Sequence, residues 1–391
     1  MKKNLFFVAL AAMTMVSCSN DETVEFKQDE VRFNVVADNA SRASELYSSD
    51  NLHDNFYVAA AYRENASDTE YSHFYIPEDQ ISYESGAWVN KTTSVRYWPQ
   101  DENLALDFYA LNIGTPYFIE NAGPNTTSNI LKFNFCVNHD VKEQRDILYA
   151  SAKGQTKAAN AESGINLNFR HALSQIVFNA VNKSASSKVV IKSVQIANVW
   201  CTANVEFNIA ANAGDTQDNY TVDQEDAYEG MDKPLTINLV THGGTSQDSY
   251  IADFEDVTIE GGGEANLTNG NKELTMLLLP QTQVAWAEVQ DKDGVLQPNY
   301  GAYFLIDCEL YNIGVDGEEE TDYTPVYTGK VKVPVEIAWN MGTKYIYTFI
   351  FGAVGGSGSD IFPTITYNIT VDDFYNGSVT EVPVHTGEDE E

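Results

Sequence analysis

Cys18 is the residue whose surroundings most clearly specify a chemical reaction. Two lysines precede an apolar run, LFFVALAAMTMV at residues 5–16, and the cysteine follows one serine later. The run is too short to span a bilayer, so residues 1–17 are predicted to be a signal peptide. The tetrad MVSC at 15–18 is similar to a bacterial lipobox, whose cysteine is diacylated and becomes the mature N-terminus. An ordinary secretory signal with an incidental cysteine is the alternative.

Arg42 is the second residue with a distinct chemical possibility. It is the single arginine of a soft, small-residue loop in the stretch VRFNVVADNASRA, just after a predicted strand. In that strand Val31, Phe33 and Val35 would point to one face. A loop of this kind is where a protease can cut, whereas the backbone of a strand, which contains Arg32, is harder to draw into a protease cleft. The sequence therefore suggests a first strand on a cleavable tether.

No other group of residues matches an active site. The histidines are scattered without metal-ligand spacing: His53, His73, His139, His171, His242 and His385. DKDG at 291–294 begins like a calcium loop but lacks the later bidentate glutamate, so a hairpin turn is expected. GGSGSD at 355–360 lacks the nucleophile-elbow pattern and is interpreted as a flexible joint. We expect no metal, no cofactor and no enzymatic activity. A glycoside hydrolase would need two facing carboxylates, which the sequence cannot identify among 57 acidic residues.

Charge and cysteine content limit the partners and the compartment. Lys and Arg total 23 against 57 Asp and Glu, a net charge of −34. Phosphates would be repelled, which argues against nucleic acid and anionic lipid as partners. With Cys18 acylated, three cysteines remain, at 136, 201 and 308. Their apolar neighbours suggest small buried core residues rather than a disulfide framework.

Segments in which apolar and polar residues alternate are expected to form the strands that position the residues discussed above. The expected strands are 104–111, 130–137, 173–181, 189–199, 235–240, 274–280, 302–311, 345–352 and 364–371. Asn-Gly, Asp-Gly and Gly-Gly-Gly turns lie between them, and no long segment has helical periodicity. The chain is therefore predicted to be all-β, and the strand count exceeds one sandwich, so two are expected.

The domain boundaries follow from the polar interruptions of this pattern. After the signal peptide, residues 18–42 would form the tether and removable first strand. The N-terminal β-sandwich is predicted at 43–168, because the Ala, Gly and Ser-rich stretch 151–164 interrupts the strands. The C-terminal β-sandwich is predicted at 169–391.

Six stretches, taken in order, resemble the landmarks of the fimbrillin family, the Bacteroides-type (type V) pilins and their Mfa-like relatives. They are VRFNVVADNASRA, RYWPQDENLALDFYAL, DILYASA, FRHALSQIVFNA, LLLPQ and WNMGTKYIYTFIF. The resemblance covers nearly the whole chain, behind a lipobox. The acidic SNDE after Cys18 also resembles the surface-export signal of Bacteroides-type lipoproteins. Each stretch also has a structural interpretation, so His171 is expected to be a packing residue rather than a ligand.

The resemblance implies two transthyretin-like β-sandwich domains and an assembly mechanism. The lipoprotein precursor would be carried to the cell surface and held at the outer membrane by its lipid anchor, and an Arg-specific protease would cut between Arg42 and Ala43. The first strand would leave, and a strand from another fimbrillin subunit would fill its groove, as in donor-strand complementation. The implied function is a structural subunit of a surface fimbria that serves adhesion.

Two C-terminal stretches could supply the donor strand. TITYNITV alternates in the required period, with one face formed by Ile365, Tyr367, Ile369 and Val371. The alternative donor is GSVTEVPVHTG at 377–387, in which case TITYNITV would be a permanent strand of its own domain. A different function also stays open at this point: a tip fimbrillin or stand-alone lipoprotein that binds host glycan or protein through Tyr220, Tyr228 and Tyr250.

Overall fold

The chain is an all-β protein, as the alternating pattern predicts. The computed structural model describes residues 30–37, 55–63, 73–84, 87–92, 95–101, 104–113, 120–121, 131–207, 235–240, 247–269, 271, 273–288, 301–312, 325–352 and 365–373. Within these ranges the helical structure is confined to one turn of 3-10 helix, Val141–Glu143, and the short α1, Lys157–Asn160. Each of the nine segments expected to be strands overlaps a strand of the structure.

A seven-stranded sheet forms the N-terminal end. Its order is β1 (Phe33–Ala37), β9 (Ile165–His171), β8 (Leu148–Gln155), β5 (Ala105–Asn112), β2 (Phe56–Arg63), β3 (His73–Glu84) and β4 (Ala87–Asn90). All eight residues of the central β5 are buried, because both faces of this sheet are covered. One face encloses a cluster that includes Phe56, Phe108 and Phe169.

A second sheet covers the other face of the seven-stranded sheet. Its order is β13 (Leu235–Leu239), β12 (Thr202–Phe207), β7 (Leu131–Cys136) and β6 (Glu120–Asn121), and we call it the bridging sheet. Phe133 and Phe135 of β7 join Tyr109 of β5 in one hydrophobic core. β7 precedes the predicted boundary at 168 and β12 follows it, and the two strands pair antiparallel. The division into 43–168 and 169–391 stays a prediction, and this sheet contains strands from both parts.

Two further sheets pack face to face at the C-terminal end. One contains β15 (Glu264–Asn266), β10 (Ser174–Asn182), β21 (Thr343–Phe351) and β22 (Thr366–Asp373), with β16 (Met276–Leu278) also beside β10. The other contains β14 (Gln247–Ile259), β11 (Ser187–Trp200), β18 (Tyr303–Asn312) and β19 (Tyr327–Pro334). Aromatic rings fill the space between them: the ring centroid of Phe304 lies 5.6 Å from that of Phe178 and 5.2 Å from that of Phe349. A small two-stranded sheet pairs β17 (Thr282–Gln283) with β20 (Ile337–Ala338).

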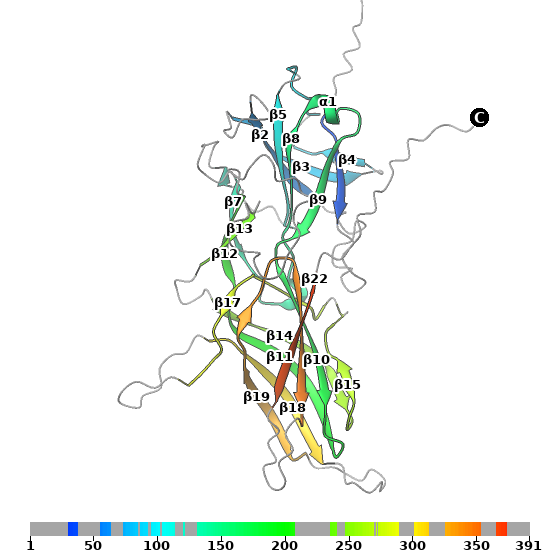
Figure 1. The fold of residues 1–391 in the computed structure, drawn as a ribbon, viewed down its shortest axis with the longest axis vertical. Helices are drawn as coiled ribbons and strands as arrows, with labels where there is room; N and C mark the ends of the chain where they lie inside the picture. The colour runs from blue at the N-terminus through cyan, green and yellow to red at the C-terminus, as the bar shows by residue number, and fades with distance from the viewer. Residues whose placement is uncertain are drawn as a thin grey trace, which may run out of the picture.

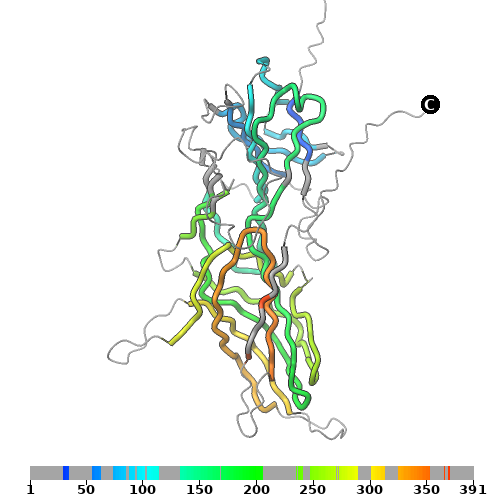
Figure 2. The backbone as a smooth tube through the Cα atoms, viewed as in Figure 1, coloured from blue at the N-terminus to red at the C-terminus, as the bar shows by residue number. Residues whose placement is uncertain are grey.

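The molecule is elongated, with β2, β5 and β8 toward one end and β18 and β19 toward the other (Figure 1). Figure 2 follows the path from the blue and cyan N-terminal strands to the yellow and orange C-terminal strands. One extended stretch connects the two ends, because β11 of the C-terminal sandwich ends at Trp200 and β12 of the bridging sheet begins at Thr202. Only Cys201 separates these strands.

Candidate site of strand exchange

The first strand, β1, lies at the edge of the seven-stranded sheet and is held on both of its sides. On one side it pairs parallel with β9 over five residue pairs, from Phe33↔Ile165 to Ala37↔Phe169. On the other side the Val31 N–H donates to the Arg96 carbonyl at 2.8 Å, and Glu30 forms an antiparallel bridge with Tyr97. Glu30 and Val31, which precede β1, therefore attach the beginning of this segment to residues 95–97.

Aromatic packing holds the side chains of β1 inside this curl. The ring centroid of Phe33 lies 6.1 Å from that of Phe56 and 5.7 Å from that of Phe108, both edge-to-face. Phe56 and Phe108 are fully buried, whereas Phe33 and Val31 are half-buried against the same cluster. Val35 is opposite Leu167 in the backbone register. The half-buried side chains of Val31 and Phe33 thus cover rings that are fully buried in the cluster.

Polar bonds also hold the residues at the start of β1. The Arg32 carbonyl accepts from the Ile165 N–H at 2.8 Å. The Asn34 side-chain amide donates to the Ser163 carbonyl at 2.7 Å and to Asn166 Oδ1 at 3.1 Å. Because the carbonyl of Arg32 is bonded, the peptide bond after it cannot enter a protease cleft without breaking this pairing.

An ion pair between Asp79 and Arg96 anchors segment 95–97. The sequence pattern did not predict this pair. Asp79 on β3 is fully buried, and its carboxylate accepts from Arg96 Nε at 2.7 Å and from Arg96 Nη2 at 2.9 Å. Asn90 donates to the same carboxylate at 2.6 Å. The hydrogen bond to Asp79 raises the pKa of the Arg96 guanidinium, although burial opposes this effect. Tyr75 adds a bond from its hydroxyl to the Tyr97 carbonyl at 2.5 Å. RYWP is part of a landmark stretch of the sequence, but no local signal in β3 marks Asp79 as the partner of Arg96.

The donor candidate TITYNITV is the edge strand β22 of its own sheet in this structure. It pairs antiparallel with β21 over eight residue pairs, including Tyr367↔Phe349 and Val371↔Tyr345. Ile365, just before the strand, is buried, whereas Ile369 is 44% exposed. The candidate face is therefore not uniformly buried within its own domain.

Several predicted residues lie outside the described part of the chain. These are the signal peptide with Cys18, the cleavage pair Arg42 and Ala43, the loop tyrosines Tyr220 and Tyr228, and the alternative donor 377–387. Tyr250, the third tyrosine proposed for ligand binding, is fully buried in β14, so it cannot form an exposed binding platform. Its hydroxyl donates to the Val137 carbonyl at 3.5 Å.

The other chemical groups behave as structural residues, with one correction. His171 is buried, and its Nδ1 lies 2.5 Å from Asp146 Oδ2, in agreement with a packing role. Cys201 and Cys308 are buried, but Cys136 is exposed, so the interpretation of all three as core residues is wrong for Cys136. Strand alternation is the reason, because Phe133 and Phe135 point inward and Cys136 follows Phe135. In the described ranges no three His, Cys, Asp or Glu side chains group as metal ligands, and no helix could cross a membrane.

The landmark motifs contact one another across the fold. DILYASA meets FRHALSQIVFNA through Asp146 and His171, and Asp146 Oδ1 also accepts from the Leu173 N–H at 3.3 Å. FRHALSQIVFNA meets WNMGTKYIYTFIF where Ser174 donates to the Asn340 carbonyl at 2.8 Å. LLLPQ meets the last motif through two backbone bonds between Gln281 and Trp339, at 2.8 and 3.1 Å. The bond from Val31 to Arg96 likewise connects the first two motifs with each other. Each of the six motifs therefore contacts at least one other motif.

Comparison with known proteins agrees with this arrangement. The family described as fimbrillin-like matches residues 42–371. The chain belongs to the fimbrillin-like family. No curated protein matches it.

The structure of this fimbrillin-like chain was also compared with solved structures. A fimbrial protein from Bacteroides vulgatus has a TM-score of 0.53 at 14% identity, and the match covers 88% of this chain and 99% of that chain. A candidate cell adhesion protein from Bacteroides uniformis has a TM-score of 0.40 at 12% identity, with 88% and 99% covered. Another from Parabacteroides distasonis has a TM-score of 0.41 at 10% identity, with 88% and 97% covered. The first of these likenesses shows a shared fold.

Proposed function

We propose that this fimbrillin-like chain is a structural, non-enzymatic subunit of a cell-surface fimbria that serves adhesion. The precursor is a lipoprotein, acylated at Cys18 and held at the outer membrane until processing. An Arg-specific protease cuts between Arg42 and Ala43, β1 leaves, and a strand from another subunit enters the vacated groove. The family, and the fimbrial protein of Bacteroides vulgatus that shares its fold, support this assignment.

The observation that carries the proposal is the double-sided hold on β1. Once it leaves, β9 has an unpaired edge, segment 95–97 loses the N–H of Val31, and the rings of Phe56 and Phe108 become exposed. Open edges and exposed apolar grooves favour the addition of another strand. Full burial of a Val or Phe side chain contributes about 1.5–3 kcal/mol. Because Val31 and Phe33 are only half-buried, a donor that buries more apolar surface can replace them.

The two donor candidates make different demands on the subunit. Use of β22 requires its eight pairs with β21 to break, which exposes a second sheet edge. Use of 377–387, which follows β22 in the chain, leaves that sheet intact. Four apolar side chains of a donor would contribute roughly 6–12 kcal/mol before the comparable cost of ordering about eight residues. Use of β22 as the donor therefore has an additional cost, because its pairs with β21 must break before it can enter the groove of another subunit.

Protease treatment of the purified precursor tests the proposal. An Arg-specific protease should give a new N-terminus at Ala43 and ladders of SDS-resistant oligomers. Arg42→Ala should abolish both products, because it removes the scissile residue. Arg32→Ala is the matched control and should leave both unchanged, because the Arg32 carbonyl is bonded to Ile165. Complete cleavage at Ala43 that yields only monomer would refute polymerisation, and fibres from uncleaved Arg42→Ala would refute the removable strand.

A further inference from the structure

A lysine and two aromatic rings form a compact group on the surface of the C-terminal sandwich. The Nζ atom of Lys332 lies 3.9 Å from the ring centroid of Trp286 and 4.5 Å from that of Tyr303. The two ring centroids are 6.3 Å apart, and the rings meet edge to face. Lys332 is exposed and both rings are half-buried, so solvent reaches this group. We call Trp286, Tyr303 and Lys332 the Trp286 cluster.

Backbone contacts hold the tryptophan of this cluster in place. The Trp286 N–H donates to the Ala302 carbonyl at 2.9 Å, and the Ala302 N–H donates to the Val284 carbonyl at 2.8 Å. A Cβ atom on Gly301 would lie 2.5 Å from the carbonyl oxygen of Ala285, so the close approach of the two segments requires glycine. A surface that is already ordered in this way loses little conformational entropy when a ligand binds.

The outer face of the sheet β14–β11–β18–β19 continues the apolar surface beside the cluster. The strand register places Leu305 directly opposite Lys332, with Gln195 and then Ile251 in the same row. Ile251 is 40% exposed, and Val284 is 70% exposed. An exposed apolar surface beside aromatic rings is typical of an interaction site.

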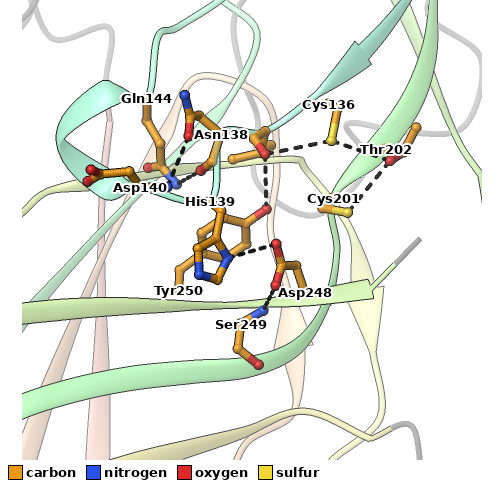
Figure 3. Close-up of polar contacts among 11 residues, drawn as sticks. Cys136, Asn138, His139, Asp140, Gln144, Cys201, Thr202, Asp248, Ser249 and Tyr250 are labelled. Carbon is orange, nitrogen blue, oxygen red and sulfur yellow. Dashed lines mark hydrogen bonds and ion pairs between the residues drawn. The ribbon is translucent and has the colours of Figure 1, made fainter. Parts of the chain in front are cut away.

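The ammonium group of Lys332 has no carboxylate partner in the part of the chain that the structure describes. By contrast, Lys192 Nζ of β11 lies 2.6 Å from Glu309 Oε1. The side chain of His139 also has an acidic partner, because its Nδ1 lies 3.0 Å from Asp248 Oδ2 (Figure 3). Lys332 is therefore a cation whose described contacts are with aromatic rings, and its ammonium group can pair with an anion from outside the chain.

We propose that the Trp286 cluster binds a carbohydrate that carries a single carboxylate group. The ammonium group of Lys332 pairs with the carboxylate, which places the sugar ring beside Trp286 and Tyr303. The C–H groups of a sugar carry a partial positive charge and are attracted to the negative faces of aromatic rings. The inference rests on the adhesive function proposed above, to which it gives a class of ligand, and it does not depend on strand exchange.

The charge of the whole chain limits how many anionic groups this ligand carries. A net charge of −34 repels a polyanion over its whole length. Salt screens this long-range repulsion, so one carboxylate in direct contact with Lys332 is still attracted. A second copy of the chain would also bring carboxylates to Lys332. Two copies repel each other, however, and a stable protein interface buries about 800 Å² on each side, so a small ligand is favoured.

Binding of defined sugars to the uncleaved full chain tests the proposal. The acidic probes are sialyllactose and methyl glucuronide, each with one carboxylate, and the medium contains about 0.15 M sodium chloride. Lactose, which has no carboxylate, and acetate, which has no sugar ring, are the matched control ligands. NMR saturation transfer and titration should show that at least one acidic sugar binds about ten-fold more tightly than either control.

Three variants assign the binding to the cluster. Lys332→Gln and Trp286→Ala should each weaken binding of the acidic sugar by about ten-fold, whereas Lys332→Arg should retain it. Lys330→Gln is the matched control, because it removes the same charge two residues earlier on β19 and should change the affinity less than about two-fold. Circular dichroism and thermal melting check that each variant is folded. Lys332→Gln changes an exposed side chain, so its result does not depend on a core substitution.

Two results would overturn the proposal. The first is that neither acidic sugar binds, or that Lys332→Gln binds as tightly as the parent. The second is self-association of the parent that Lys332→Gln removes, measured by analytical ultracentrifugation, because this would make a second copy the partner. Since the chain stays uncleaved, either result leaves protease-triggered assembly untested, and a failure of assembly after cleavage would leave sugar binding unchanged.

Discussion

At the scale of single residues, Asp79 and Arg96 control how firmly the first strand is attached. The carboxylate of Asp79 fixes the side chain of Arg96. The backbone carbonyl of Arg96 in turn accepts a hydrogen bond from the Val31 N–H, just before β1. A fully buried carboxylate is stable in this position because three N–H groups, from Arg96 and Asn90, donate to it. If β1 leaves as proposed, the ion pair would oppose its release through the backbone of segment 95–97.

Asp79→Asn should lower the free energy of unfolding by about 2–3 kcal/mol, because the amide cannot satisfy a partly buried guanidinium. The variant should also release β1 faster after cleavage at Arg42. Urea denaturation measures the first effect, and mass spectrometry of the freed peptide measures the second. Glu84→Gln is the matched control, because the ion pair of Glu84 with Lys91 lies at the surface and should contribute less than about 1 kcal/mol. Equal losses in the two variants would contradict the argument.

At the scale of elements, β1 and β22 differ in what their removal would disturb. β1 pairs parallel with β9, and the described side chains Val31 and Phe33 insert into a groove of fully buried rings. β22 pairs antiparallel with β21 along eight residue pairs, but Ile369 in its middle is 44% exposed. The first strand therefore fills an enclosed groove, whereas the last strand extends an open edge.

Phe33→Ala should accelerate the departure of β1 after cleavage, because it removes the edge-to-face contacts with Phe56 and Phe108. The lost contacts amount to about 1–2 kcal/mol, which corresponds to a roughly ten-fold change in the retention of the strand. The freed peptide can be followed by chromatography over time. Arg32→Ala, which alters an exposed side chain, should change the rate less than about two-fold. A Phe33→Ala strand that stays bound as long as the parent would show that backbone pairing alone retains it.

The alternating pattern predicted ten of the strands, but it missed others, including β3 and β14, and it did not indicate which strands are neighbours. A period of two assigns the side chains of β5 to alternating faces, and both faces of this strand are buried. Nothing in that period indicates that β12 pairs with β7, which lies far away in sequence. The same limit applies to Asp79 with Arg96 and to Asp146 with His171, because each pair forms only when distant segments pack. The proposal of a removable first strand draws on a local feature, the lone arginine in the neighbouring loop, and stays a prediction.

At the scale of the whole molecule, the net charge of −34 affects how subunits meet. Like charges of this size repel, so copies of the chain approach slowly at low ionic strength. Salt screens the repulsion over a Debye length of about 10 Å at 0.1 M and leaves the apolar groove unchanged. In the proposed assembly the charge would therefore oppose the encounter of two subunits, while burial of apolar side chains in the vacated groove would favour the final complex.

Assembly of the cleaved chain should therefore become faster as sodium chloride is raised from about 0.02 to about 0.3 M. Light scattering after complete cleavage, with the protease inhibited, measures the rate without contributions from processing. The uncleaved Arg42→Ala chain serves as the control and should show no increase in scattering at any salt concentration. A rate that falls with salt would mean that attractive charges, rather than apolar burial, drive the association.

The continuous run from β11 through Cys201 into β12 has a mechanical consequence. When a subunit is pulled at opposite ends, tension can pass along the covalent backbone of this run instead of across a seam between two separate modules. The neighbouring ladders β11–β14, β11–β18 and β12–β7 are then loaded in shear, so many hydrogen bonds must rupture together before the body extends. A filament of such subunits would resist stretching more strongly than separate sandwiches on a flexible string.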